Sequence, residues 1–186
     1  MNPMNGHHLI LGELDDLITG ETIKDTHDER YRQKIAQLLL NQKGYLKTDI
    51  SPRRKLTVTA GDCKAMVKVD FVIQFADRIG MIIKFGPGSI VTRRRPVLAA
   101  SRIMAPYQIP VAVVTNGKDA EILDGLTGSI LSTGLESIPS KSMLQEMATD
   151  DHFKTIEKNR AAMESRIVYC FEVDGSCPCD EDVCRL

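Results

Sequence analysis

Three apolar, strand-like segments follow one another between residues 55 and 85, and this run constrains the fold more than any other feature. The segments cover 55–60, 65–75 and 78–85, with Gly61-Asp62 and Ala76-Asp77 between them. Antiparallel neighbours need only a short turn, whereas parallel neighbours need a crossover of a dozen or more residues. The sequence therefore predicts three antiparallel strands in a meander.

Two predicted helices and one further strand lie before and after this meander in the chain. A helix with an apolar stripe is predicted from Thr26 or Asp28 up to Gly44, which ends it. A second helix is predicted over 95–105, and the nearly continuous apolar run 110–114 is typical of a strand buried on both faces. This order of helix, three strands, helix and strand predicts an α/β fold with a mixed sheet.

The rest of the chain is divided by weaker patterns. The other expected elements are short strands at 120–123 and 129–131 and helices at 140–147 and 151–166. Near the N-terminus, Leu14, Leu17 and Ile18 have helix-compatible spacing and are followed by Gly20, which predicts a packed arm. We therefore expect an N-terminal arm (1–25), a core domain (26–138), C-terminal helices (139–166) and a Cys-rich tail (167–186).

Composition narrows the class of protein. The 186 residues are 42% hydrophobic, enough for one sizeable core. The net charge of -1 gives no overall attraction to nucleic acid, so any such binding must come from local patches. The sequence has no run of 18 apolar residues and no signal peptide, so we expect a soluble, cytoplasmic protein without a membrane partner.

The cysteines are concentrated at one end of the chain. Cys63 stands alone, and the last 17 residues hold Cys170, Cys177, Cys179 and Cys184. Four thiolates could hold Zn²⁺ or an iron–sulfur cluster and tie the tail to a predicted strand at 167–173. Their spacing matches neither a zinc ribbon nor a ferredoxin, and the alternative is a flexible tail with free thiols.

Asp70 in the second strand of the meander and Lys84 at the end of the third form the main candidate site. Adjacent strands bring them close. A carboxylate can hold a hard cation, and a neighbouring lysine can assist an attacking water. The alternative is a salt-bridged pair at the end of a sheet.

Four stretches of the chain carry a family resemblance. They are Asp28-Glu29-Arg30-Tyr31-Arg32-Gln33, Gly44-Tyr45, Val69-Asp70-Phe71-Val72 and Val113-Val114-Thr115-Asn116-Gly117. In combination they resemble the N-terminal domain of type I restriction enzyme R subunits, which belongs to the PD-(D/E)XK nuclease superfamily, over roughly residues 26–124. The resemblance implies the restriction-endonuclease-like αβββαβ core.

The resemblance also implies roles for individual residues. Glu29 matches the helix glutamate and Asp70 the strand aspartate that bind Mg²⁺, and Lys84 matches the lysine that acts on water. Ile82 stands where the family has a second metal-binding acid, and isoleucine cannot bind a metal. The helix at 95–105 has no Asp or Glu that could replace it.

Five arginines are candidates for contact with a nucleic-acid backbone. The triplet at the start of the second helix, together with a pair before the first strand, forms this set: Arg93, Arg94, Arg95, Arg53 and Arg54. The alternative is a solvated charged loop.

Two functions remain open on sequence grounds. One is a Mg²⁺-dependent DNA endonuclease with a degenerate site. The other is a catalytically inactive module of the same fold that binds DNA or responds to metal or redox state. DNA is the expected partner, with a second copy of the chain or a restriction-system or helicase protein as further candidates.

Overall fold

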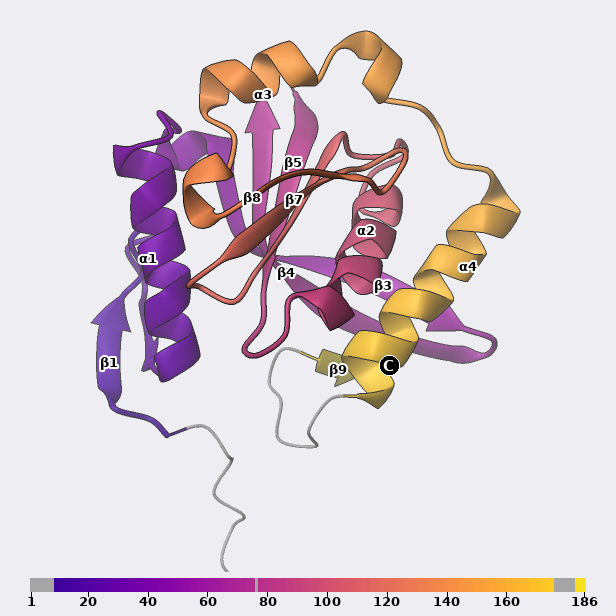
Figure 1. Ribbon diagram of the computed structural model, residues 1–186. Helices are drawn as coiled ribbons and strands as arrows, with labels where there is room; N and C mark the ends of the chain where they lie inside the picture. Colours follow the sequence, from indigo (N-terminus) through magenta and orange to yellow (C-terminus); the bar gives the residue numbers. More distant parts are fainter. Residues whose placement is uncertain (1–8, 76, 176–182) are drawn as a thin grey trace, which may run out of the picture.

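The computed structural model describes residues 9–75, 77–175 and 183–186, and it has a seven-stranded mixed sheet with helices on both faces (Figure 1). The strands of this sheet are β3 (Ile50–Ala60), β4 (Cys63–Phe75), β5 (Arg78–Phe85), β6 (Val111–Thr115), β7 (Ala120–Asp124), β8 (Ile130–Thr133) and β9 (Val183–Arg185). The α-helices are α1 (His27–Asn41), α2 (Arg94–Ile103), α3 (Lys141–Met147) and α4 (Lys158–Tyr169). The predicted α/β class with a mixed sheet is confirmed.

The sheet follows the order of the chain, β3-β4-β5-β6-β7-β8, with β9 paired to β4. Strands β3, β4 and β5 form the antiparallel meander that their short connections predict. The β5–β6 pair is parallel, and α2 supplies the long connection that such a pair requires. The C-terminal ends of β5 and β6 therefore point in the same direction.

Each face of the sheet has its own hydrophobic core. Helix α1 covers one face through Ile35 and Leu39, which pack in a cluster with Phe71 and Ile83. Helices α2 and α4 cover the other face, on the opposite side of the sheet from α1 in Figure 1, in a cluster that includes Ile82. Strand β6 is buried at every position because both cores need it, as its continuous apolar run predicted.

The N-terminal arm is a β-hairpin, so its helix-compatible spacing was misleading. Strands β1 (Gly12–Asp15) and β2 (Thr22–Asp25) pair antiparallel. Asp16 makes the turn between them, because its Oδ1 accepts hydrogen bonds from the backbone N–H groups of Ile18 and Thr19. Ile18 is buried against the α1 core, which explains why the arm is packed.

The C-terminal segments also differ from their prediction. Helix α4 begins at Lys158, later than residue 151, because Phe153 leaves the helical path to pack edge-on against Tyr107. The predicted strand over 167–173 is wrong. That segment continues α4 and then widens into the π-helix η5 (Cys170–Asp174), which buries Val173 in the core shared with α2.

None of the helices in the described part of the chain is long and apolar enough to cross a membrane.

Candidate functional site on β4 and β5

The register of β4 and β5 sets Asp70 and Lys84 next to each other. Phe71 lies opposite Ile83, and Asp70 and Lys84 are the next residues on the two antiparallel strands. Glu29 is in the first turn of α1, where the hydroxyl of Thr26 caps the helix by accepting from the Glu29 amide. Both carboxylates are buried. Burial of a charged group requires compensating partners, and these partners define what the site can do.

Both oxygens of Asp70 are occupied by protein donors. Arg32 Nε donates to Oδ1 at 2.6 Å, and the backbone N–H of Phe85 donates to Oδ2 at 2.8 Å. The Arg32 side chain is held in place by the ring of Phe85, whose centroid lies 5.4 Å from its guanidinium carbon. Asp70 therefore anchors α1 and the end of β5 to β4.

Glu29 belongs to a chain of alternating charges that runs from the N-terminal hairpin to β4. Arg53 Nη2 lies 2.7 Å from Asp16 Oδ2 and 2.8 Å from Glu29 Oε1, and Arg32 Nη1 lies 3.6 Å from Glu29 Oε2. The order along the chain is Asp16, Arg53, Glu29, Arg32 and Asp70. Burial raises the pKa of Asp16, but the Thr19 amide, Arg53 and Gln33 outweigh it and hold that pKa below its usual value.

Arg53 has a strained backbone in this chain. Its φ of 50° lies in the left-handed region, which is uncommon for residues other than glycine. Such a conformation costs on the order of 1–3 kcal/mol and persists where surrounding contacts fix it. The two carboxylates that receive the Arg53 guanidinium supply those contacts.

Lys84 is held by a residue from the far end of the chain. Its Nζ donates to Glu172 Oε2 at 2.8 Å and to the carbonyl oxygen of Lys68 at 3.0 Å. Burial lowers the pKa of Lys84, but Glu172 and Asp70 outweigh it, and the pKa is raised overall. Lys84 thus stays protonated, and Glu172 in η5 is its nearest counter-charge.

Ile82 occupies the place of the second acid in the resemblance, and it is fully buried in the core under α2 and α4. Burying such a side chain stabilises the fold by about 1.5–3 kcal/mol. Among the described residues, no three side chains of His, Cys, Asp or Glu are grouped so that they could hold a metal ion. The carboxylates of Glu29 and Asp70 both contact arginine guanidiniums, and Ile82 offers no ligand atom for a metal ion.

The predicted nucleic-acid contacts separate into two groups. Arg53 pairs with acids inside the site, Arg94 pairs with Glu121, and Arg95 pairs with Glu164. The remaining two, Arg54 and Arg93, form no ion pair within the part of the chain that the structure describes.

Arg54 and Arg93 each lie close to Asp70 or Lys84 in the sheet. Arg54 lies opposite Val69, one residue before Asp70 on β4. The guanidinium of Arg93 packs against Gly86, directly after β5, since a side-chain carbon added at Gly86 would lie 2.5 Å from it.

The predicted cysteine cluster is only partly within the described residues. Cys170 and Cys184 are exposed and form no disulfide there. Cys177 and Cys179 lie outside the described residues.

The sequence pointed to Asp70 and Lys84 but not to the side chains that pair with them, Arg32 and Glu172. Arg32 could have been found, because it follows Glu29 by three residues and so shares its helix face. Glu172 carries no such signal, because 88 positions separate it from Lys84.

Comparison with known proteins places the same segment in a family. A family model described as the type I restriction enzyme R protein N terminus matches residues 27–139. Searches of curated proteins and of solved structures found no match.

Proposed function

Because the chain belongs to the family of type I restriction enzyme R protein N termini, we propose that it is a DNA-binding domain in which the nuclease site has become a set of structural ion pairs. The observation that carries this proposal is the engagement of Asp70. One of its oxygens accepts from Arg32 and the other from the Phe85 amide. A carboxylate in these contacts would have to give up a charge-assisted hydrogen bond to bind a cation.

The burial of Ile82 supports the same proposal. Metal-dependent phosphodiester cleavage requires several oxygen ligands around a hard cation and an activated water. Ile82 supplies an alkyl group at one ligand position and is 0% exposed. Lys84 is protonated and paired with Glu172, so its ammonium can attract a phosphate but cannot accept a proton from water.

DNA contact is proposed for Arg54 and Arg93. These guanidiniums have no protein carboxylate as partner among the described residues, and a phosphate group satisfies the same fork of donors. Arg54 lies opposite Val69, the neighbour of Asp70 on β4, and Arg93 packs against Gly86, two residues after Lys84. Because the overall charge is -1, the proposed DNA binding depends on this local patch. Contacts between arginine and phosphate weaken as the salt concentration rises.

The first experiment is a cleavage assay with supercoiled plasmid in Mg²⁺ and, separately, in Mn²⁺. We expect no nicking above the level of an Asp70→Asn variant purified in the same way. Nicking that requires both Asp70 and a divalent cation would overturn the proposal and restore the endonuclease reading.

The second experiment measures duplex DNA binding by fluorescence anisotropy over a range of salt concentrations. Neutralising one phosphate contact should reduce the slope of log K against log [salt] by about 0.9. We expect this reduction in Arg54→Gln and in Arg93→Gln. Lys47→Gln is the matched control, because Lys47 is exposed and precedes β3 at the end of the sheet where β5 begins. Equal slopes in all three variants would contradict the proposed surface.

A further inference from the structure

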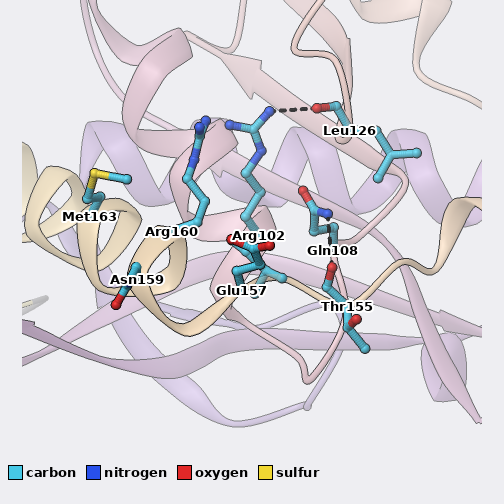
Figure 2. Close-up of a pocket in the computed structure, with 9 residues that line it drawn as sticks. Arg102, Gln108, Leu126, Thr155, Glu157, Asn159, Arg160 and Met163 are labelled. Carbon is cyan, nitrogen blue, oxygen red and sulfur yellow. Dashed lines mark hydrogen bonds between the residues drawn. The ribbon is translucent and has the colours of Figure 1, made fainter.

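A cavity of about 470 Å³ lies between α2, α4 and the segment that leads into α4, on the face of the sheet opposite α1. Figure 2 shows its polar lining: the guanidiniums of Arg102 and Arg160 together with the side chains of Gln108 and Asn159. None of these residues belongs to the site at Asp70 and Lys84. The cavity therefore needs an explanation of its own.

Its two arginines belong to a cluster with too many positive charges. Arg102 Nη1 and Arg160 Nε both donate to Glu164 Oε1 at 2.8 Å, and Arg95 pairs with the other oxygen of Glu164. Glu164 is 0% exposed. One carboxylate thus faces three guanidiniums, which leaves a local excess of two positive charges.

The cluster is not fully hydrogen-bonded. Arg95 Nη1 and Glu164 Oε2 are buried without a hydrogen-bond partner, although Arg95 Nη2 lies 2.5 Å from Glu164 Oε2 in an ion pair. More of the Arg102 N–H donors have partners, because the backbone carbonyl oxygens of Gly125 and Leu126 accept hydrogen bonds from its guanidinium. Arg160 is half-exposed, and Glu164 is its ion-pair partner among the described residues, so its remaining N–H donors are available at the cavity. The one acid in the lining is Glu157, which is exposed.

An anion is the ligand that such a lining selects. Phosphate matches the guanidinium fork in geometry, and its negative charge offsets the local excess of positive charge, which is one when Glu157 is counted. The cavity is larger than a bare phosphate requires, and Gln108 and Asn159 offer neutral donors and acceptors beyond the arginines. Leu126 and Met163 add apolar surface for an organic group.

We propose that this cavity binds a phosphate monoester of nucleotide size, with its phosphate between Arg102 and Arg160. The proposal is independent of DNA binding at Arg54 and Arg93. Glu164 is the internal counter-ion that keeps the two guanidiniums together when the cavity holds no ligand. The carboxylate of Glu157 repels the anionic ligand and so lowers its affinity.

The test is calorimetric titration of the full chain with adenosine 5′-monophosphate, with inorganic phosphate and with adenosine. We expect binding of the monophosphate, weaker binding of inorganic phosphate and none of the uncharged nucleoside. Arg160→Gln should weaken monophosphate binding about tenfold or more, since it removes charge-assisted hydrogen bonds. Arg166→Gln is the matched control, because Arg166 is exposed on the same helix and does not line the cavity.

Glu157→Gln guards against a folding artefact, because it leaves the contacts of Glu164 intact and should tighten monophosphate binding by removing a like charge. A site for inorganic phosphate alone would appear as equal affinity for phosphate and monophosphate, and it would overturn the nucleotide-sized ligand. Absence of binding by the wild-type chain, or equal affinity in wild type and Arg160→Gln, would overturn the site itself.

Discussion

Lys84 Nζ lies 2.8 Å from Glu172 Oε2, and this ion pair joins the end of β5 to the π-helix that follows α4. The Lys84 side chain is 15% exposed and the Glu172 side chain 18% exposed, so solvent screens the pair only in part. The acid beside the lysine therefore comes from outside the matched segment 27–139.

Replacing Glu172 with Gln should lower the free energy of unfolding by about 1–3 kcal/mol, because Lys84 loses its main counter-charge in a mostly buried position. Urea unfolding measures the change. Glu146→Gln is the control, since Glu146 is exposed on α3, and it should change the value by less than about 0.5 kcal/mol.

The same pair predicts a dependence on pH. The pKa of Lys84 is higher in the folded chain than its ordinary value, so the stabilisation is fully present below the unfolded pKa of about 10.4 and is lost as the pH rises through the folded-state pKa. The difference between wild type and Glu172→Gln should therefore be constant near neutral pH and shrink in strong alkali. A difference that grows with pH would contradict this assignment.

Ile82→Glu should destabilise the protein by about 2–7 kcal/mol, because the new carboxyl group enters an apolar core without a partner. Restoring the acid of the family pattern should not restore metal binding, since Arg32 still holds Asp70. Thermal melting with and without Mn²⁺ checks both statements. The control is Ile82→Val, with an expected cost of roughly 0.5–1.5 kcal/mol. A large Mn²⁺-dependent rise in the melting temperature of Ile82→Glu would show that the metal site is recoverable.

Glu164→Gln should cost roughly 3–5 kcal/mol, because it removes the only carboxylate that three arginines share in the described core. Burial raises the pKa of Glu164, but Arg160, Arg102 and Arg95 together hold it below its usual value. The stabilisation is therefore present above about pH 4.3 and is lost as the pH falls through the folded-state pKa. Unfolding at several acid pH values should show wild type approaching the variant, and parallel curves would rule out Glu164 as the source.

Gly125→Ala should cost roughly 3 kcal/mol or more, because its side-chain carbon would lie 1.8 Å from the Ile109 carbonyl oxygen and backbone would have to move. Gly61→Ala is an informative comparison. It meets no atom within 4 Å but has a φ of +62°, so conformational strain alone should cost on the order of 1–2 kcal/mol. Chemical denaturation of both variants separates the two causes, and equal losses would contradict the steric argument.

The sheet could be predicted because its signals are local. Residues 78–85 form a short apolar run between two turns, which predicts β5 without reference to any other segment, and the unbroken apolar run in β6 indicates burial on both faces. The N-terminal hairpin was not predicted, because its local apolar spacing points to the wrong structure. Its apolar spacing fits a helix, but the turn chemistry of Asp16 decides the structure.

The centre of the candidate site could also be read from the sequence, whereas its electrostatic partners could not. Asp70 and Lys84 follow from neighbouring strands. Arg53 was predicted to contact a nucleic-acid backbone, and its ion pairs with Asp16 and Glu29 had no signal in the sequence. Glu172 depends on the path of α4 across the sheet, which no pattern in the sequence encodes.

The pairing of β9 with β4 has a consequence for the order in which the chain folds. Residues 65–67 of β4 pair with 183–185 of β9, whereas the meander brings together residues that are close in the chain. Contacts at short separation form early, and those that close long loops wait for loop-closure entropy to be overcome. During synthesis the meander can assemble well before β9 and η5 have left the ribosome. At that stage Lys84 lacks its ion-pair partner Glu172. We expect an intermediate in which β9 and η5 are not yet docked on β4 to be the last species to disappear on refolding.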